Sequence, residues 1–404
     1  MSERFTLIGL GDSPMPEFST TVRDAIAVHR VFAGGERHHM LVEGLLPCGY
    51  RWITIEPPID NILAMLRAEP EPITVFASGD PFFYGFGATL QRAFPGASFV
   101  SYPWFHSLQR VAQLGLLPYQ KMRHASLTGR SWKELDALLI AGAPLIGVLT
   151  DHRKTPAAIA SRLIEYGFCK YSLIVGEALG GPEERVRRLS PEAAEKELFH
   201  QLNSVVLLAD NPPERLFGIS EDLFEGLHGR PGMITKMPVR MATLSRLNLL
   251  NARNFWDIGF CTGSVSIEAK LLVPELDVIA FERRPECADI LECNCRRFRT
   301  PGISKVMGDF ILQDHESFVK PFGSVDSVFI GGHGGRIDAL FPVIDRWLSP
   351  GGRVVVNAVR ETSLQAFRAL FSGAGYNMSD DLRIVPGNHY PVTVATAEKP
   401  GKRS

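Results

Sequence analysis

Short apolar runs alternate with longer amphipathic segments along the whole chain. The apolar runs have the length of β-strands, and the amphipathic segments have the length and apolar spacing of helices. This alternation is typical of an α/β protein with mainly parallel sheets. In the first half, the pattern predicts strands at 5–10, 73–77, 145–149, 171–175 and 204–209. It predicts helices at 20–31, 61–68, 108–114 and 156–166, the last with Thr155 as N-cap and Pro156 at its first position.

The second half continues the pattern in a more regular form. After two prolines, Pro212 and Pro213, a loop-rich stretch leads into a helical segment near Thr235. We therefore expect one domain at 1–210, a linker at 211–224 and a second domain at 225–404. The second domain should contain strands at 255–259, 278–282, 325–330 and 353–359 and helices at 264–272, 285–298 and 337–348. The polar residues 398–404 should be frayed.

The composition is that of an ordinary globular protein. Of the 404 residues, 45% are hydrophobic and 22% are charged, which excludes wholesale disorder, a collagen-like chain and a coiled coil. The net charge of −1 argues against a nucleic-acid partner, which would need a basic surface. No run of about 18 uncharged apolar residues is present, so we expect no membrane span.

The six cysteines indicate neither a disulfide framework nor a metal site. No pair has C-x-x-C spacing, and Cys287, Cys293 and Cys295 cannot all share one face of the predicted helix. The chain begins with an apolar run that meets a glycine turn, which does not have the form of a signal peptide. We therefore expect free thiols, a cytoplasmic location and no bound metal.

The most informative local pattern is a glycine-bearing turn between a predicted strand and a predicted helix. The strand ends at Asp257, and the turn contains Gly259, Cys261 and Gly263. Such a turn places backbone N–H groups and a helix N-terminus beside a ligand. Glu282, 19 residues after Gly263, ends the next strand, where an acid can accept hydrogen bonds from ribose hydroxyls. The pair predicts an adenosine-containing cofactor; an ordinary turn without a ligand is the alternative.

Other glycine-rich turns follow predicted strands in both halves. The segment 331–335 contains four glycines and His333, and Asn357 ends the next strand at the same edge. In the first half, Gly9 and Gly11 close one strand, and the segment 77–85 with Asp80 closes another. Basic clusters at 121–130 and 152–154 could hold substrate carboxylates. The alternative for each of these segments is a flexible or solvated loop without a ligand.

Several of these segments resemble known families. IGLGD at 8–12, VFAGGERH at 31–38, ASGDPFFYG at 77–85, SLTGR at 126–130 and the segment 147–160 are similar to the tetrapyrrole methylase family, whose members are class III S-adenosylmethionine enzymes. GMITK at 232–236, DIGFCTGSVSIEA at 257–269, GDF at 308–310, FIGGHGG at 329–335 and PGGRVVVNAV at 350–359 resemble decarboxylating C-15 methylases of cobalamin biosynthesis. Cys261 stands where those enzymes usually have glycine. The domain order is similar to that of fused C-5,15-methylating enzymes.

The resemblance implies a fold and two cofactor sites. The first domain would be a bilobal, class III tetrapyrrole methylase that acts at C-5 of a precorrin macrocycle. The second would be a Rossmann-like, class I methyltransferase that acts at C-15 and removes the carboxyl of the C-12 acetate. Each domain would bind one S-adenosylmethionine. The implied cofactor residues are Gly9, Gly11, Ser78, Gly79, Asp80, Ser107 and Thr150 in the first domain and Thr235, Gly259, Gly263, Glu282, Asp309 and Phe310 in the second.

Three further residues are candidates for the chemistry of the second domain. Lys236, Arg240 and His333 could contact the acetate and propionate groups of the macrocycle. No covalent nucleophile and no metal is expected, because methyl transfer rests largely on positioning. The resemblance also implies a homo-oligomer. The alternatives are a methyltransferase for another substrate, and a protein in which only one half is active and the other binds or carries the macrocycle.

Overall fold

The structure, a computed structural model, describes residues 4–387 and 390–401. Contacts within the chain divide it into two compact units. The first comprises 1–130, 144–162 and 169–211, and the second comprises 131–143, 163–168 and 212–404. Two short segments of the first half, 131–143 and 163–168, thus group with the second unit. The predicted domain limits (1–210, 211–224 and 225–404) stay a prediction. No helix in the described ranges has both the length and the apolar character that a membrane crossing requires.

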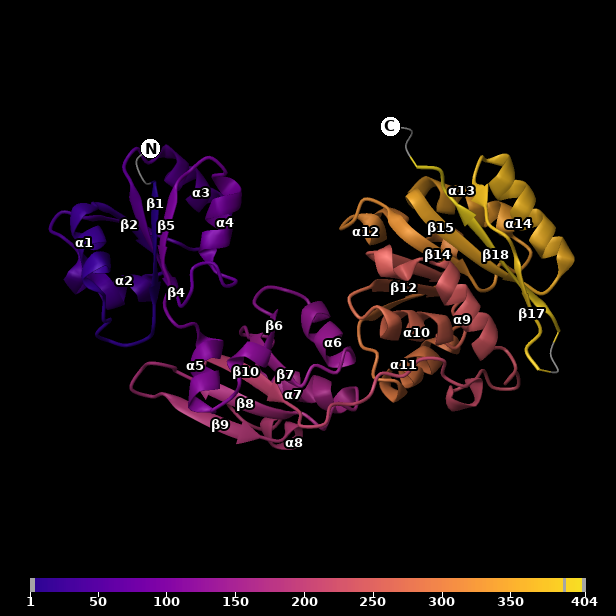
Figure 1. The fold of residues 1–404 in the computed structure, drawn as a ribbon, viewed down its shortest axis with the longest axis horizontal. Helices are drawn as coiled ribbons and strands as arrows, with labels where there is room; N and C mark the ends of the chain where they lie inside the picture. Colours follow the sequence, from indigo (N-terminus) through magenta and orange to yellow (C-terminus); the bar gives the residue numbers. More distant parts are fainter. Residues whose placement is uncertain (1–3, 388–389, 402–404) are drawn as a thin grey trace. The chain divides into compact units, whose positions relative to one another are not determined.

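The first unit contains two five-stranded sheets (Figure 1). In the first sheet all strands are parallel, in the order β3-β2-β4-β1-β5. Its strands are β1 (Phe5–Leu10), β2 (Val31–Gly34), β3 (Arg51–Thr54), β4 (Ile73–Ser78) and β5 (Phe99–Tyr102). The carboxyl ends of β1, β2 and β4 therefore lie side by side at one edge, where α/β sheets bind ligands.

The second sheet has the order β6-β7-β10-β8-β9 and is mainly antiparallel. Only β6 and β7 run parallel; the pairs β7–β10, β10–β8 and β8–β9 are antiparallel. The expectation of mainly parallel sheets is thus wrong for this sheet. Its strands are β6 (Arg123–Ser126), β7 (Leu145–Leu149), β8 (Ser172–Glu177), β9 (Arg185–Leu189) and β10 (Asn203–Leu208).

The helices of the first 211 residues include those expected and several short additions. Thr155 accepts a hydrogen bond from the Ala158 N–H at 3.3 Å, which confirms it as the N-cap before Pro156. The helices are α1 (Thr20–Val28), α2 (Glu36–Val42), α3 (Ile59–Ala68), α4 (Phe86–Ala93), α5 (Ser107–Leu114), α6 (Lys133–Ile140), α7 (Pro156–Glu165) and α8 (Pro191–Ala194), with 3-10 turns η1 (Glu43–Leu45) and η2 (Tyr119–Lys121).

The second unit is built on one sheet with the order β13-β12-β11-β14-β15-β18-β16, to which β17 pairs through β18. The five neighbouring strands β13, β12, β11, β14 and β15 are parallel to one another. The strands β16, β17 and β18 are added by antiparallel pairing. The strands are β11 (Asn254–Ile258), β12 (Asp277–Glu282), β13 (Ile303–Met307), β14 (Val325–Ile330), β15 (Leu348–Ala358), β16 (Asn377–Met378), β17 (Leu382–Ile384) and β18 (Val392–Glu398).

Helices cover both faces of this sheet, because its strands are apolar on both sides. Phe255 and Val355 pack in a cluster with residues of α9 and α10, while their neighbours Trp256 and Val356 pack in a cluster with residues of α13 and α14. The helices are α9 (Met237–Arg246), α10 (Ser264–Leu272), α11 (Cys287–Arg297), α12 (His315–Val319), α13 (Ile337–Trp347) and α14 (Glu361–Gly373), with η3 (Glu221–Leu223), η4 (Leu249–Asn251) and η5 (Phe310–Leu312).

The end of the described chain is better ordered than the sequence suggests. Glu398 is the last residue of β18 and pairs with Arg353, and the Lys399 N–H donates to the Gly352 carbonyl at 2.9 Å. The expectation of fraying from Glu398 is therefore wrong for these two residues, since strand pairing holds them. Residues 402–404 of that expected segment lie outside the described residues.

Candidate active site

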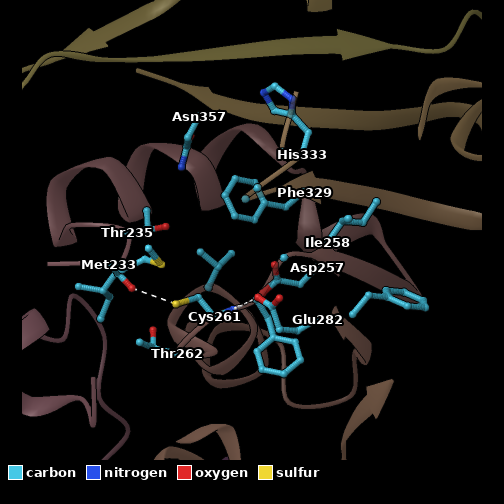
Figure 2. Close-up of a pocket in the computed structure, with 18 of the residues that line it drawn as sticks. Met233, Thr235, Asp257, Ile258, Cys261, Thr262, Glu282, Phe329, His333 and Asn357 are labelled. Atoms are coloured by element: carbon cyan, nitrogen blue, oxygen red, sulfur yellow. Dashed lines mark hydrogen bonds between the residues drawn. The ribbon is translucent and has the colours of Figure 1, made fainter. Parts of the chain in front are cut away.

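A cavity of about 610 Å³ lies at the carboxyl edge of the second unit's sheet (Figure 2). Strands β11, β12, β14 and β15 each contribute side chains near their carboxyl ends, among them Asp257, Glu282, Phe329 and Asn357. The segment before α9 contributes others, including Thr235. A parallel sheet brings the carboxyl ends of its strands to one edge, so residues far apart in sequence line one cavity.

The glycine turn after β11 packs against the loop after β14. Gly259 has φ +81°, and a Cβ there would lie 2.9 Å from the Gly332 nitrogen. Gly263 has φ +75°, and a Cβ there would lie 2.2 Å from Leu291 Cδ1. Gly259 lines the cavity, whereas Gly263 is not among the lining residues and serves the packing of α10 on α11. The cofactor contact predicted for Gly263 thus finds no support in its position.

Cys261 lies in the glycine turn and lines the cavity. Its φ of +51° lies in the left-handed region that L-residues rarely adopt. Its thiol donates to the Met233 carbonyl, with Sγ and O 3.0 Å apart, and its N–H donates to Glu282 Oε2 at 3.2 Å. The side chain therefore links the turn to the segment before α9 (Figure 2).

Glu282 is an ionised carboxylate at the cavity wall. Its side chain is 4% exposed and accepts hydrogen bonds from the backbone N–H groups of Cys261, Arg283 and Arg284. The Arg284 guanidinium adds an ion pair at 2.5 Å. Burial alone would raise the pKa of Glu282, but the Arg284 hydrogen bonds and charge outweigh it and lower that pKa. This site therefore holds a fixed negative acceptor.

Asp309 and Phe310, which follow β13, also line the cavity. Asp309 caps η5 by accepting from the Ile311 N–H at 3.1 Å and pairs with Arg336 at 2.8 Å. The Arg336 hydrogen bond lowers the pKa of Asp309. The Phe310 ring packs edge-on against Phe281, with ring centroids 4.9 Å apart. Together they contribute one charged and one aromatic group to the cavity wall.

Two of the three candidates for substrate contact line the cavity. Lys236, the N-cap of α9, has its ammonium 3.7 Å from Glu221 Oε1. His333 accepts the Gly335 N–H at Nδ1, 3.1 Å away, so the neutral ring carries its proton on Nε2. Burial lowers the pKa of His333, which favours this neutral form.

The prediction that Arg240 contacts a substrate carboxylate is wrong. Its side chain is completely buried in the described structure and is absent from the cavity wall. Nε donates to Glu268 Oε2 at 2.7 Å, and the remaining nitrogens donate to the carbonyls of Ile219 and Thr235. Because Glu268 also accepts the Ile219 N–H at 2.6 Å, the pair ties the segment before α9 to α10. Arg240 supports the cavity wall from behind.

Three lining side chains that sequence reasoning did not select carry buried polar atoms without a hydrogen-bond partner among the described residues. They are Asp257 Oδ1, Thr262 Oγ1 and Asn357 Nδ2. Burial raises the pKa of Asp257 to about 7, although Ser266 donates to its other oxygen at 2.6 Å. Such atoms cost free energy unless a ligand or water satisfies them. The sequence pattern places Asp257 and Asn357 at strand ends, a signal that could have added both to the predicted site residues.

Positive side chains predominate around the cavity. The acidic and basic residues of its lining are His333, one lysine (Lys236), four arginines (Arg230, Arg283, Arg284 and Arg336) and three acids (Asp257, Glu282 and Asp309). Two of the acids already form ion pairs, Glu282 with Arg284 and Asp309 with Arg336. The cavity therefore suits a ligand that carries carboxylates, even though the whole chain is nearly neutral.

In the first unit, the predicted glycines hold strand-end loops together. A Cβ on Gly9 would lie 2.0 Å from the Gly79 carbonyl oxygen, and one on Gly79 would lie 2.6 Å from His106 Cα. Glycine is required at both positions by backbone packing. Gly11 faces the Trp104 ring, whose Nε1 would lie 3.0 Å from a Cβ. Asp80 accepts the Phe82 N–H at 2.8 Å.

Side-chain hydrogen bonds connect the other predicted residues of this unit. Ser107, the first residue of α5, follows His106 and accepts from Ser204 Oγ at 2.7 Å. Thr150 bonds Asn203, the neighbour of Ser204, with its hydroxyl 2.8 Å from the Asn203 carbonyl. Gly9, Gly79, Ser107 and Thr150 therefore lie along one connected path from the first sheet to the second.

Comparisons with known proteins agree with this arrangement. A family model described as a precorrin methyltransferase domain matches residues 227–382. A protein of Sinorhizobium sp, named precorrin-6Y C(5,15)-methyltransferase (decarboxylating), is 31% identical over 361 residues, which make up 89% of this chain and 85% of that protein. The chain belongs to this family of decarboxylating precorrin-6Y C(5,15)-methyltransferases.

Two further relatives cover about half of the chain each. The cobalt-precorrin-6B C(15)-methyltransferase (decarboxylating) of Salmonella typhimurium strain LT2 is 34% identical over 182 residues, 45% of this chain and 90% of that protein. The crystal structure of precorrin-6y C5,15-methyltransferase from Geobacter metallireducens GS-15 is 31% identical and covers 45% of this chain and 97% of that one, with a TM-score of 0.40. The alternative in which one half of a C(5,15)-methyltransferase is idle has no support among these relatives.

Proposed function

We propose that this protein methylates a precorrin macrocycle at C-5 and C-15 and removes the carboxyl of its C-12 acetate. The observation that carries the proposal is the cavity of the second unit, where a glycine turn, the acid Glu282 and an excess of cationic side chains meet at one sheet edge. Family membership over 89% of the chain supports both activities. The first unit would perform C-5 methylation and the second C-15 methylation with decarboxylation.

The two units would have different methyltransferase folds. The parallel order β13-β12-β11-β14-β15 suits a Rossmann-like, class I domain, in which the turn after the central strand β11 approaches the cofactor. The parallel sheet followed by a mainly antiparallel sheet suits a bilobal tetrapyrrole methylase domain. We assign the class I fold to the predicted domain at 225–404 and the tetrapyrrole methylase fold to the predicted domain at 1–210.

The cavity residues fit S-adenosylmethionine. Glu282 would accept the ribose hydroxyls, replacing the two bonds that the Arg284 side chain now makes to it. Asp309 and Phe310 would flank the adenine, and Thr235 and Gly259 would approach the remainder. The unpartnered atoms of Asp257 and Thr262 would be satisfied by its polar groups. In the first unit, Gly9, Gly11, Ser78, Gly79, Asp80, Ser107 and Thr150 would surround a second cofactor.

The protein's part in the reaction is positioning and charge. When bound, S-adenosylmethionine supplies an electrophilic methyl group. The walls formed by Phe310, Phe329 and the turn at Gly259 would exclude water and align the macrocycle carbon with that methyl group. Lys236 and the arginines of the cavity would bind the carboxylates of the macrocycle, so that its C-12 acetate can lie out of the ring plane. On decarboxylation the bond between the acetate methylene and its carboxylate would break and carbon dioxide would leave. The electron pair of that bond would pass into the conjugated ring, and uptake of one proton would complete the new methyl group.

The number of cofactors is tested by titration of the full chain with S-adenosylhomocysteine. Two independent sites should give a stoichiometry of two ligands per chain in a calorimetric experiment. In the Glu282→Ala variant the stoichiometry should fall to one, because only the site of the first unit remains. A wild-type value of one would contradict the assignment of a cofactor to each unit.

Loss of the cavity donors should impair recognition of the macrocycle. The double change Lys236→Ala and His333→Ala should raise the KM for precorrin-6Y in C-15 methylation by about a hundredfold or more, because two hydrogen bonds to charged groups are lost and each contributes about 1.5–3 kcal/mol. The KM for S-adenosylmethionine should stay near the wild-type value. If C-15 methylation and carbon dioxide release both remain at wild-type level, neither residue contacts the substrate.

A further inference from the structure

Four side chains of the first unit form a hydrogen-bonded cluster at the carboxyl edge of its parallel sheet. Asp12 follows β1, Arg37 and His38 lie in the first turn of α2 after β2, and Ser78 ends β4. Arg37 forms an ion pair with Asp12 and donates from Nη2 to Ser78 Oγ at 2.9 Å. Because β2, β4 and β1 are adjacent, the cluster spans three neighbouring strand ends.

The hydrogen bonds of His38 fix which of its nitrogens carries the proton. The Gly35 backbone N–H donates to Nδ1 at 3.2 Å, so Nδ1 has to be unprotonated. Burial, and after it the charge of Arg37, lowers the pKa of His38 to about 4, which keeps the ring neutral at neutral pH. The single ring proton therefore lies on Nε2. Nε2 is 2.9 Å from Ser78 Oγ and donates to it.

These two hydrogen bonds leave the Ser78 hydroxyl able to act only as a donor. Its oxygen has two lone pairs, and it accepts from both Arg37 Nη2 and His38 Nε2. Its own hydrogen therefore points away from both donors. Ser78 is exposed, and none of the hydrogen bonds between described residues uses that hydrogen. Two donors on one oxygen also polarise the O–H bond and make it a stronger donor.

We propose that Ser78 and Arg37 form a binding site for one carboxylate group, with His38 as the residue that positions the Ser78 hydroxyl. The Ser78 O–H and the N–H groups of Arg37 that Asp12 and Ser78 leave free are the donors, and a carboxylate has the two acceptor oxygens that such a pair needs. Asp12 offsets the charge of Arg37, so the cluster suits a single negative charge and not a doubly charged phosphate.

This inference rests on the proposed function, which supplies two carboxylate sources. One is an acetate or propionate of the macrocycle, and the other is the methionine carboxylate of S-adenosylmethionine. The same donors would bind either one. The first source makes the site a determinant of macrocycle recognition at C-5, and the second makes it part of the cofactor pocket. Steady-state kinetics of the full chain distinguishes the two.

The test is Ser78→Ala in the full chain, with C-5 and C-15 methylation measured in the same reaction. Removal of the hydroxyl should raise one KM of C-5 methylation by about tenfold or more, the equivalent of one hydrogen bond to a charged group. A rise in the KM for precorrin-6Y identifies a macrocycle carboxylate, and a rise in the KM for S-adenosylmethionine identifies that of the cofactor. C-15 methylation, carried by the other unit, should not change and reports that the protein is folded.

Two substitutions of His38 separate positioning from helix capping. In His38→Asn the side-chain oxygen can still accept the Gly35 N–H, but no donor reaches Ser78. In His38→Gln an amide N–H reaches towards Ser78 Oγ. His38→Asn should therefore raise the same KM as Ser78→Ala, by a smaller factor, and His38→Gln should bring it back towards the wild-type value.

Unchanged values of both KM in Ser78→Ala would overturn the proposal, as would wild-type behaviour of His38→Asn. A wild-type protein that forms no C-5 methylated product would count against the proposed function. In that case binding of precorrin-6Y and of S-adenosylhomocysteine to the wild type and to Ser78→Ala still decides the proposal, because equal affinities of both proteins for both ligands would refute the carboxylate site.

Discussion

Glu282→Ala should strongly reduce C-15 methylation and carbon dioxide release while C-5 methylation continues. The change removes the acceptor for two ribose hydroxyls and leaves the Arg284 guanidinium in the cavity without its partner. Two hydrogen bonds to a charged group, at about 1.5–3 kcal/mol each, correspond to a fall of about a hundredfold or more in kcat/KM. The rates are measured by following both methylated products and carbon dioxide in one reaction.

The matched control for this prediction lies in the first unit. Asp80→Ala should impair C-5 methylation and spare C-15 methylation, because Asp80 caps the glycine-rich turn after β4. Glu282→Gln keeps the shape of the side chain but loses its charge, and should lie between Glu282→Ala and the wild type. Equal loss of both activities from either alanine change would contradict independent catalytic units.

Arg240→Ala should destabilise the second unit by about 3–5 kcal/mol, although Arg240 touches no ligand in this account. The change leaves the buried Glu268 carboxylate without its guanidinium partner, and removal of one member of a buried pair is costly. It also frees the carbonyls of Ile219 and Thr235, which Arg240 holds. Urea unfolding followed by the loss of C-15 activity measures this, with C-5 activity as the reference.

The double variant Arg240→Met with Glu268→Met provides the control. It removes both charges together and fills the space with apolar side chains, so its stability should lie much nearer to that of the wild type. A stable Arg240→Ala protein that binds S-adenosylhomocysteine normally but has lost C-15 methylation would contradict the supporting role and favour direct contact with the substrate.

The regular elements of the fold could be predicted where the apolar pattern is long. The predicted ranges 5–10, 145–149, 264–272 and 325–330 match β1, β7, α10 and β14 without change. The strands β2, β3, β5, β6, β9, β13, β16, β17 and β18 were missed. All of them except β18 have five residues or fewer, and only the most apolar strands of that length, such as β7, stand out from the sequence. The antiparallel pairing of β10 with β7 and β8 could not be predicted, because strand order depends on contacts distant in sequence.

The candidate site was predictable in part. Glu282 and Gly259 were found because a glycine turn and an acid at the end of the next strand have a fixed spacing. Arg240 was misplaced because its partner Glu268 is 28 residues away and their burial has no local signal. At Gly9 and Gly79 the space that a Cβ would need is filled by neighbouring backbone, a requirement visible only in three dimensions. The unpartnered atoms of Asp257, Thr262 and Asn357 also become evident only through burial.

We infer that one chain carries both methylations and the decarboxylation. Mass spectrometry of the product formed from precorrin-6Y, excess S-adenosylmethionine and the purified full chain tests it most directly. We expect a product that has gained two methyl groups and lost one carbon dioxide. A product with a single methyl group at completion, or with two methyl groups and the C-12 carboxyl intact, would contradict it.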